Sequence, residues 1–203
     1  MDAKQDPEAI ARIMANVGRT IDLDDAERDL FAGLLRPRRL ERKAVLLSPG
    51  EVCRTMVYVV EGCVKVFNVG PDGTEHIVKF AVEDWWAFDI ESFAAGTPCI
   101  YGIEAMETTD ALMLSKEDME LLYTRVPKFE RFSRILFQNS YIALQRRVEQ
   151  GLRLEASERY VEFRKKYPGL ERRIPQKSVA SYLGVTPEFL SSMRRRLVLQ
   201  ERS

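Results

Sequence analysis

The stretch Ser178–Arg196 reads SVASYLGVTPEFLSSMRRR and has the spacing of two short helices joined by a tight turn. We expect the first helix to begin near Gln176 and to end at Gly184, because glycine adopts a positive φ without steric strain. Thr186 and Pro187 then form an N-cap and first-turn pair for the second helix. The pattern predicts a helix-turn-helix.

Apolar side chains of the two predicted helices fall on facing sides and can share one small core. Ala180 is small enough to let the helices cross closely. The inward-facing set consists of Val179, Ala180, Leu183, Leu190, Met193 and Leu197.

Polar and cationic side chains remain on the outer side of the pair. Arg donates hydrogen bonds to guanine, Glu accepts from the cytosine amino group, and Ser adapts to either, while cations suit phosphates. The predicted DNA-contacting set is Gln176, Lys177, Thr186, Glu188, Ser191, Ser192, Arg194, Arg195 and Arg196. Further phosphate contacts are expected from Lys165, Lys166, Arg172 and Arg173. The alternative is a solvated basic helix pair with no partner.

The charge distribution agrees with a DNA-binding C-terminal part. The whole chain of 203 residues has a formal net charge of zero, with 31 basic and 31 acidic residues. Residues 151–203 carry 12 Lys and Arg against 6 Asp and Glu, whereas the first 150 residues carry 19 against 25. The excess of positive charge therefore lies where phosphates would be met.

The remainder of the chain predicts helices, then strands, then helices. Residues 6–35 read as two helices, the first with Asp6 as N-cap and Pro7 in its first turn. Short β-rich runs separated by turn residues follow from Arg38 to Leu114, a pattern typical of an antiparallel sandwich or barrel. The sequence SKED at 115–118 then resembles a capping box, and helical spacing continues to about Tyr167.

A seam within the helical part indicates a homodimer. Positions spaced alternately by three and four residues suit a coiled coil, although an amphipathic helix lying on its own domain is the alternative. The predicted seam is Phe129, Phe132, Leu136, Asn139, Ala143, Arg146 and Gln150.

Composition argues against membrane and secreted classes. No run approaches the roughly 20 apolar residues of a membrane span, and the N-terminus is acidic and polar where a signal peptide is basic and then apolar. Cys53, Cys63 and Cys99 lack C-x-x-C spacing and read as ordinary core residues. We expect a cytoplasmic protein with no membrane partner.

Taken together, these segments resemble the cAMP receptor protein / FNR (Crp/Fnr) family of bacterial transcriptional regulators. MVYVVEGCVKVFNVGPDGTEHIVKF is similar to the β-roll hairpins of the family and includes its turn glycine, Gly62, while SKEDMELLYTRVPKFERF resembles the start of its dimer helix. IPQKSVASYLGVTPEFLSS is the most specific segment. The resemblance implies a homodimer on two-fold double-stranded DNA, with Glu188 and Ser191 at base-reading positions, and leaves RNA polymerase open as a further partner.

The expected fold class is α+β. It comprises an N-terminal antiparallel β-roll of the cyclic-nucleotide-binding, jelly-roll type with preceding helices at residues 1–125, a long dimerisation helix at 126–153, and a helix-turn-helix domain of winged-helix type at 154–203. The resemblance departs at Ser192, where many members carry arginine. With seven residues after Arg196, we expect no wing.

The match is thinnest in the effector region. In the family, a glutamate and a later arginine bind the ribose and phosphate of a cyclic nucleotide. Glu91 suits the first role, but Cys99 stands at the arginine position, and no Lys or Arg occurs between Lys79 and Lys116. A buried phosphate without a cation is costly, so we expect no cAMP or cGMP binding.

The same region is a candidate site for an uncharged or apolar effector. Its aromatic side chains would then line the site; the alternative is that they belong to the core. Its residues are Glu91, Cys99, Ile100 and Tyr101, with Trp85, Trp86 and Phe88 nearby.

The sequence offers few residues that could bind the metal centres known in this family or in other β-roll proteins. An iron–sulfur cluster needs clustered N-terminal cysteines, and the single histidine, His76, lies in an expected strand where a surface role is commoner than haem ligation. A cupin-type metal enzyme needs two or more histidines. We therefore predict no cofactor and a regulator rather than an enzyme, with a regulatory ligand- or protein-binding module that does not bind DNA as the alternative.

Overall fold

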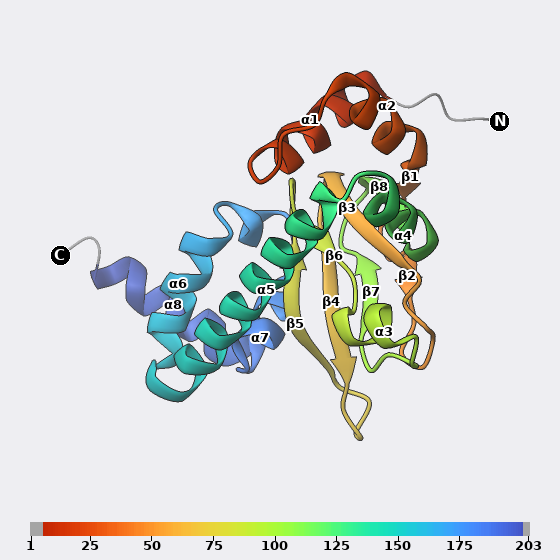
Figure 1. The fold of residues 1–203 in the computed structure, drawn as a ribbon. Coiled ribbons are helices and arrows are strands. Elements are labelled where there is room, and N and C mark those ends of the chain that lie inside the picture. The colour runs from red at the N-terminus through yellow and green to blue at the C-terminus, as the bar shows by residue number, and fades with distance from the viewer. Residues whose placement is uncertain (1–5, 201–203) are drawn as a thin grey trace.

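The computed structural model describes residues 6–200 and shows two parts joined by a long helix (Figure 1). A β-roll of two packed sheets forms one part, with two N-terminal helices at one end. A small group of C-terminal helices forms the other part and lies beside the roll. This is the mixed α+β architecture expected from the sequence.

The helices and strands follow the predicted order. The N-terminal half contains α1 (Pro7–Gly18), α2 (Asp25–Leu34), β1 (Arg36–Leu40), β2 (Val45–Leu47), β3 (Thr55–Glu61), β4 (Val64–Val69), β5 (Glu75–Ala81), β6 (Trp86–Ala87) and α3 (Ile90–Ala95). The remainder contains β7 (Gly102–Ala105), β8 (Thr109–Ser115), α4 (Lys116–Arg125), α5 (Lys128–Arg153), α6 (Ala156–Lys166), the 3₁₀ turn η1 (Leu170–Arg172), α7 (Gln176–Leu183) and α8 (Pro187–Gln200).

All strand pairs of the roll are antiparallel and form two four-stranded sheets, ordered β1-β8-β3-β6 and β2-β7-β4-β5. Gly62, at the turn from β3 to β4, has a φ of +102°. A Cβ atom there would lie 2.6 Å from Thr109 Oγ1, so the close passage of β8 requires glycine. The predicted turn glycine is thereby confirmed.

The N-terminal end of α5 belongs to the core of its own β-roll. Phe129 packs against Phe31 with ring centroids 4.9 Å apart, and Phe132 packs against Trp86 at 5.9 Å. Phe129 and Phe132 are 0% and 4% exposed. The prediction that these two residues line a dimer seam is wrong, because their apolar face is already covered within the protomer.

The edge of β5 is covered by the C-terminal helices instead of another strand. Ser181 of α7 makes hydrogen bonds that a neighbouring strand would otherwise make. Its Oγ accepts from the Ile77 N–H at 3.0 Å and donates to the Glu75 carbonyl at 2.7 Å. Arg147 of α5 donates to the carbonyls of Ile77 and Val78 at 2.9 and 2.7 Å. An edge that would otherwise be open is therefore satisfied by side chains.

Arg147 also connects this edge to the helix-turn-helix. It donates to the Tyr182 carbonyl at 2.9 Å, and its guanidinium lies 4.0 Å from the centroid of the Tyr182 ring. Tyr182 in turn packs on Phe80 of β5, with ring centroids 5.5 Å apart. One side chain of α5 thus contacts both parts of the molecule.

An apolar cluster continues the contact beneath these hydrogen bonds. Phe80 and Tyr167 pack edge to face at 5.8 Å, and both are fully buried. Lys79 lies at the same junction and donates to the Trp86 carbonyl at 2.7 Å. Burial, reinforced by the charge of Lys166, lowers the pKa of Lys79 to about 8. The cluster combines residues of both parts: Cys63, Phe67, Ile77, Phe80, Met106, Tyr160, Phe163, Tyr167, Leu170, Ile174, Val179, Ala180, Leu183, Leu190 and Met193.

Replacing Arg147 by Met should loosen the C-terminal helices from the roll. The carbonyls of Ile77, Val78 and Tyr182 would lose their donor, and a buried acceptor left unsatisfied costs about 1–3 kcal/mol. We expect a lower urea midpoint and faster hydrogen exchange in α6–α8. The neighbouring Arg146→Met variant is the control, because Arg146 is exposed. Equal behaviour of the two variants would contradict the role given to Arg147.

Candidate DNA-binding surface and effector region

The turn between α7 and α8 has the geometry predicted from the sequence. Gly184 caps α7 in the left-handed region, with φ 68° and ψ 38°. Thr186 Oγ1 accepts a hydrogen bond from the Phe189 N–H at 3.2 Å, which fits its role as N-cap of α8. Pro187 is the first residue of α8, where its missing N–H is not needed.

The inward face of the helix pair is closed. Ala180 is 1% exposed where the helices cross, and Leu190 is completely buried. Leu197 is partly buried against the same cluster. The predicted inward set is confirmed, since the other members, Val179, Leu183 and Met193, are buried as well.

The predicted DNA-contacting residues divide into two groups by exposure. The exposed group stands free on the outer side of the helix pair and contains Lys177, Thr186, Glu188, Ser192, Arg195 and Arg196. The half-buried group contains Gln176, Ser191 and Arg194. Glu188, Ser192 and Arg195 point most directly away from the buried Leu190, because they follow one another by three or four residues on the opposite face.

Arg194 is half-buried, whereas Arg195 and Arg196 are exposed. Its charge acts on Tyr160 of α6, whose hydroxyl bonds to Glu171. Burial and this carboxylate raise the pKa of Tyr160 to about 12, and the charge of Arg194 opposes the increase. Arg194 is therefore less available to a ligand than Arg195 or Arg196.

Arg173, a predicted phosphate contact, is engaged within the protein. It bridges Glu83 at 2.5 Å and Glu107 at 2.6 Å, both of which belong to the β-roll. These hydrogen bonds raise the pKa of Arg173, although burial opposes them. Its position identifies an interdomain ion pair that local sequence could not reveal, because the partners are 90 and 66 residues away.

The residues predicted to bind an effector differ in their exposure. Glu91 and Ile100 are exposed, and Tyr101 is partly buried against the core. Cys99 is buried, and its Sγ donates toward the carbonyls of Tyr101 and Ser48 at 3.1 and 3.4 Å. Burial raises the pKa of the Cys99 thiol, so it stays neutral.

Aromatic side chains fill the space behind this segment. Phe88 packs on Phe93 at 5.6 Å and on Phe137 of α5 at 5.8 Å. Trp86 is 3% exposed and packs on Tyr58. Trp86 and Phe88 thus lie in the core, and Trp85 and Tyr101 are partly buried against it. The buried carboxylate here is Asp89, which caps α3 by accepting from the Ser92 N–H at 2.9 Å; sequence reasoning chose the exposed Glu91 instead.

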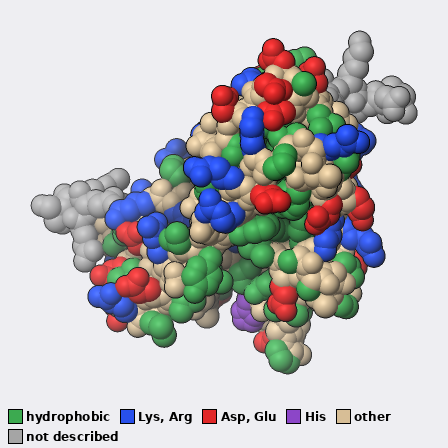
Figure 2. All heavy atoms as spheres, viewed as in Figure 1, with side chains coloured by type: hydrophobic (Ala, Val, Ile, Leu, Met, Phe, Trp, Pro, Cys, Tyr) green, Lys and Arg blue, Asp and Glu red, His purple; other side chains and the backbone are tan. Residues whose placement is uncertain are grey.

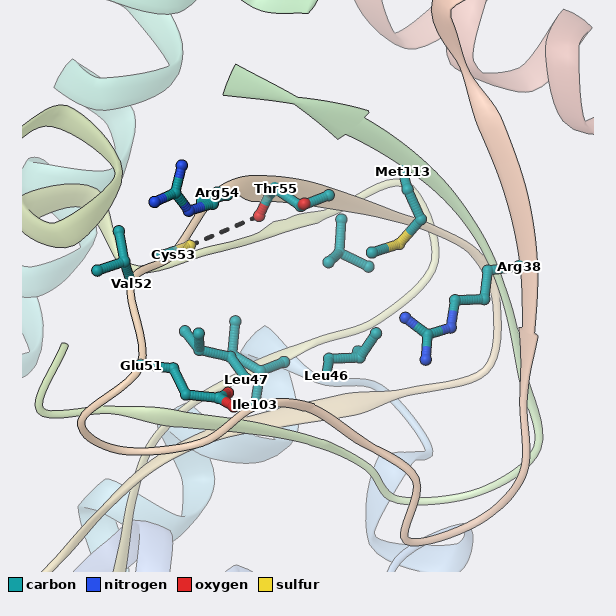
Figure 3. A pocket seen from close by; sticks show the side chains of 11 residues that line it. Arg38, Leu46, Leu47, Glu51, Val52, Cys53, Arg54, Thr55, Ile103 and Met113 are labelled. Atoms are coloured by element: carbon teal, nitrogen blue, oxygen red, sulfur yellow. Dashed lines mark hydrogen bonds between the residues drawn. The ribbon is translucent and has the colours of Figure 1, made fainter. Parts of the chain in front are cut away.

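A separate hollow of about 510 Å³ lies in the roll (Figure 3). Arg38 of β1 points into it, and its lining includes Val57 and Ile103, which are 2% and 1% exposed. The remaining lining residues are Leu46, Leu47, Glu51, Val52, Cys53, Arg54, Thr55 and Met113. None of the four predicted effector residues is among them.

The C-terminal half of α5 carries an exposed apolar stripe (Figure 2). Successive members are spaced by three, four and four residues and therefore lie on one side of the helix. The stripe consists of Tyr141, Leu144, Val148 and Leu152, which are 61%, 56%, 54% and 82% exposed. The stripe lines a shallow groove of about 740 Å³.

Other candidate centres have ordinary environments. His76 is exposed on β5, as expected, and all three cysteines are free and buried. Burial raises the pKa of Cys63 to about 12. Among residues 6–200, no cluster of three or more His, Cys, Asp or Glu side chains could hold a metal ion. Within the same residues, no helix is long and apolar enough to cross a membrane.

Comparison with known proteins agrees with these features. The cyclic nucleotide-binding domain family matches residues 37–125. No curated protein matches the sequence. FixK2 from Bradyrhizobium japonicum superposes with a TM-score of 0.72 at 16% identity, covering 82% of this chain and 86% of FixK2.

Two further solved structures show the same likeness. The c-di-GMP-responsive global regulator CLP from Xanthomonas campestris has a TM-score of 0.70 at 14% identity, over 88% of this chain and 93% of CLP. A Crp/Fnr-family transcriptional regulator from Eubacterium rectale has a TM-score of 0.69 at 17% identity, over 88% and 85%. Residues 37–125 are thus similar to the cyclic nucleotide-binding domain family, and the chain has the fold of the Crp/Fnr transcriptional regulators.

Proposed function

We propose that the protein is a homodimeric, sequence-specific DNA-binding transcriptional regulator of the Crp/Fnr type. The observation that carries the proposal is the outer face of α8, where Glu188, Ser192 and Arg195 are exposed while Leu190 and Met193 are buried. In this division the sensor domain spans residues 1–125, the dimer helix 126–153 and the DNA-binding domain 154–203.

The dimer contact is assigned to the apolar stripe of α5. Four large apolar side chains on one side of a 26-residue helix are favourable in water only when a partner covers them. A second copy of the same helix matches this shape, since a two-fold axis brings identical stripes together. The proposed dimer contact therefore involves a different side of α5 from the one that carries Phe129 and Phe132.

Sedimentation should show a dimer of the wild-type protein at micromolar concentration. Replacing Leu144 and Val148 together by Glu should give a folded monomer, because four carboxylates would enter an apolar contact. Val45→Glu is the matched control: Val45 is 51% exposed on β2, away from the stripe. A wild-type monomer, or a double variant that remains dimeric, would refute the assignment.

Base reading and phosphate binding are given to different residues of α8. Glu188 stands in the first turn, where helix-turn-helix proteins contact base edges. Arg196 is exposed farther along the helix and suits a phosphate. If the protein is instead a module that does not bind DNA, it should show no salt-dependent affinity for DNA.

Glu188→Ala should change the preferred base at one position of each half-site, by about 1–3 kcal/mol. Arg196→Ala should weaken binding to all sequences alike and flatten the salt dependence by about one unit per lost contact. Selection from random DNA combined with salt titration measures both effects. The roles are misassigned if Glu188→Ala keeps the wild-type motif while Arg196→Ala alters it.

The β-roll is proposed to work without cAMP. Cys99 is buried and bonded to carbonyls, and Phe88 is packed between Phe93 and Phe137. A cyclic phosphate would have to displace this packing and would meet no cation among residues 80–115.

Isothermal titration of the purified dimer with cAMP should give no binding at micromolar nucleotide, and cAMP should leave the melting temperature unchanged. A dissociation constant in the micromolar range or tighter would overturn this account of the pocket.

A further inference from the structure

The first turn of α8 carries a large apolar side chain at the protein surface. Phe189 is 46% exposed, whereas Leu190 and Met193 of the same helix are 0% and 4% exposed. The N–H of Phe189 is held by Thr186 Oγ1, so the residue occupies a fixed place in a capped turn. An aromatic ring in water is unfavourable and gains from any partner that covers it.

Three exposed residues of α8 near Phe189 are polar or charged. Glu188 precedes it, and Ser192 and Arg196 follow at three and seven residues, on the same side of the helix. All three are exposed. An isolated aromatic ring among charges is a poor surface for a protein partner, whose buried centre is depleted of charge.

We propose that Phe189 recognises a thymine in each half-site by packing on its C5 methyl group. The inference rests on the proposed DNA-binding function and assigns part of its specificity. Base edges in the major groove present hydrogen-bond donors and acceptors, and the thymine methyl is the one apolar group among them. A phenyl ring offers no hydrogen bond, so a polar base edge in its place would lose water without compensation.

Deoxyuridine provides the test, because it lacks only the methyl group and keeps the pairing edge of thymine. A binding site is first selected from random duplex DNA with the wild-type protein. Each thymine of that site is then replaced by deoxyuridine, in one half-site and in both. At one symmetric position we expect about a four-fold loss of affinity per half-site and about fifteen-fold for both, the value of one buried methylene-sized group.

The protein variants complete the cycle. Phe189→Ala should bind thymine and deoxyuridine DNA equally, with wild-type circular dichroism because the ring is exposed. Phe189→Leu should retain part of the discrimination. Val161→Ala is the control: Val161 is 38% exposed on α6 and should keep full discrimination.

Two results would overturn the inference while leaving DNA binding intact: a wild-type protein that is insensitive to deoxyuridine at every position, or a Phe189→Ala variant that keeps the full discrimination. A wild-type protein that enriches no sequence from random DNA would instead refute the proposed function, and the thymine contact with it.

Discussion

The hydrogen bonds that Arg147 donates to the backbone of β5 determine how the two parts of this protein meet. A sheet edge has unpaired carbonyl and amide groups that must find partners when helices bury them. Arg147 and Ser181 supply those partners from α5 and α7. The helix-turn-helix is consequently held on the β-roll by directional bonds as well as by the packing of Phe80 and Tyr167.

The long helix α5 lies in three different environments along its length. Its first turns, at Phe129 and Phe132, complete the core of the roll. Farther along, Phe137 packs on Phe88 beside the effector segment. Beyond that point one side carries Arg147, while another carries the apolar stripe from Tyr141 to Leu152.

The local signals in the sequence were reliable because they depend on neighbouring residues only. Gly184 and the Thr186–Pro187 pair placed both helices of the helix-turn-helix, and Ser115 caps α4 through the Asp118 N–H as the SKED motif predicts. Strands β1 and β6 were less visible. β1 reads RPRRL, with mostly exposed side chains, and β6 contains two residues that depend on β3 for pairing.

The errors concern choices that only tertiary structure makes. Helical spacing showed that α5 is amphipathic but could not tell which apolar positions face the protomer's own core, so Phe129 was assigned to a seam although it is buried within the protomer. Likewise, the charge of Arg173 was visible in the sequence, whereas its partners Glu83 and Glu107 were brought close by folding. The burial of Asp89, which caps α3, was likewise not visible in the sequence, because it depends on the residues that folding packs around this carboxylate.

The hydrogen bonds of Ser181 to the edge of β5 make the β-roll depend on the C-terminal helices. Moving α7 away from the roll would uncover the Glu75 carbonyl and the Ile77 amide together with the apolar side chains of Ile77 and Phe80. That surface is an open β-edge with an apolar flank, which invites pairing with another chain. The C-terminal helices thus cover an edge that could otherwise pair with another chain, and the β-roll without them would be prone to aggregate.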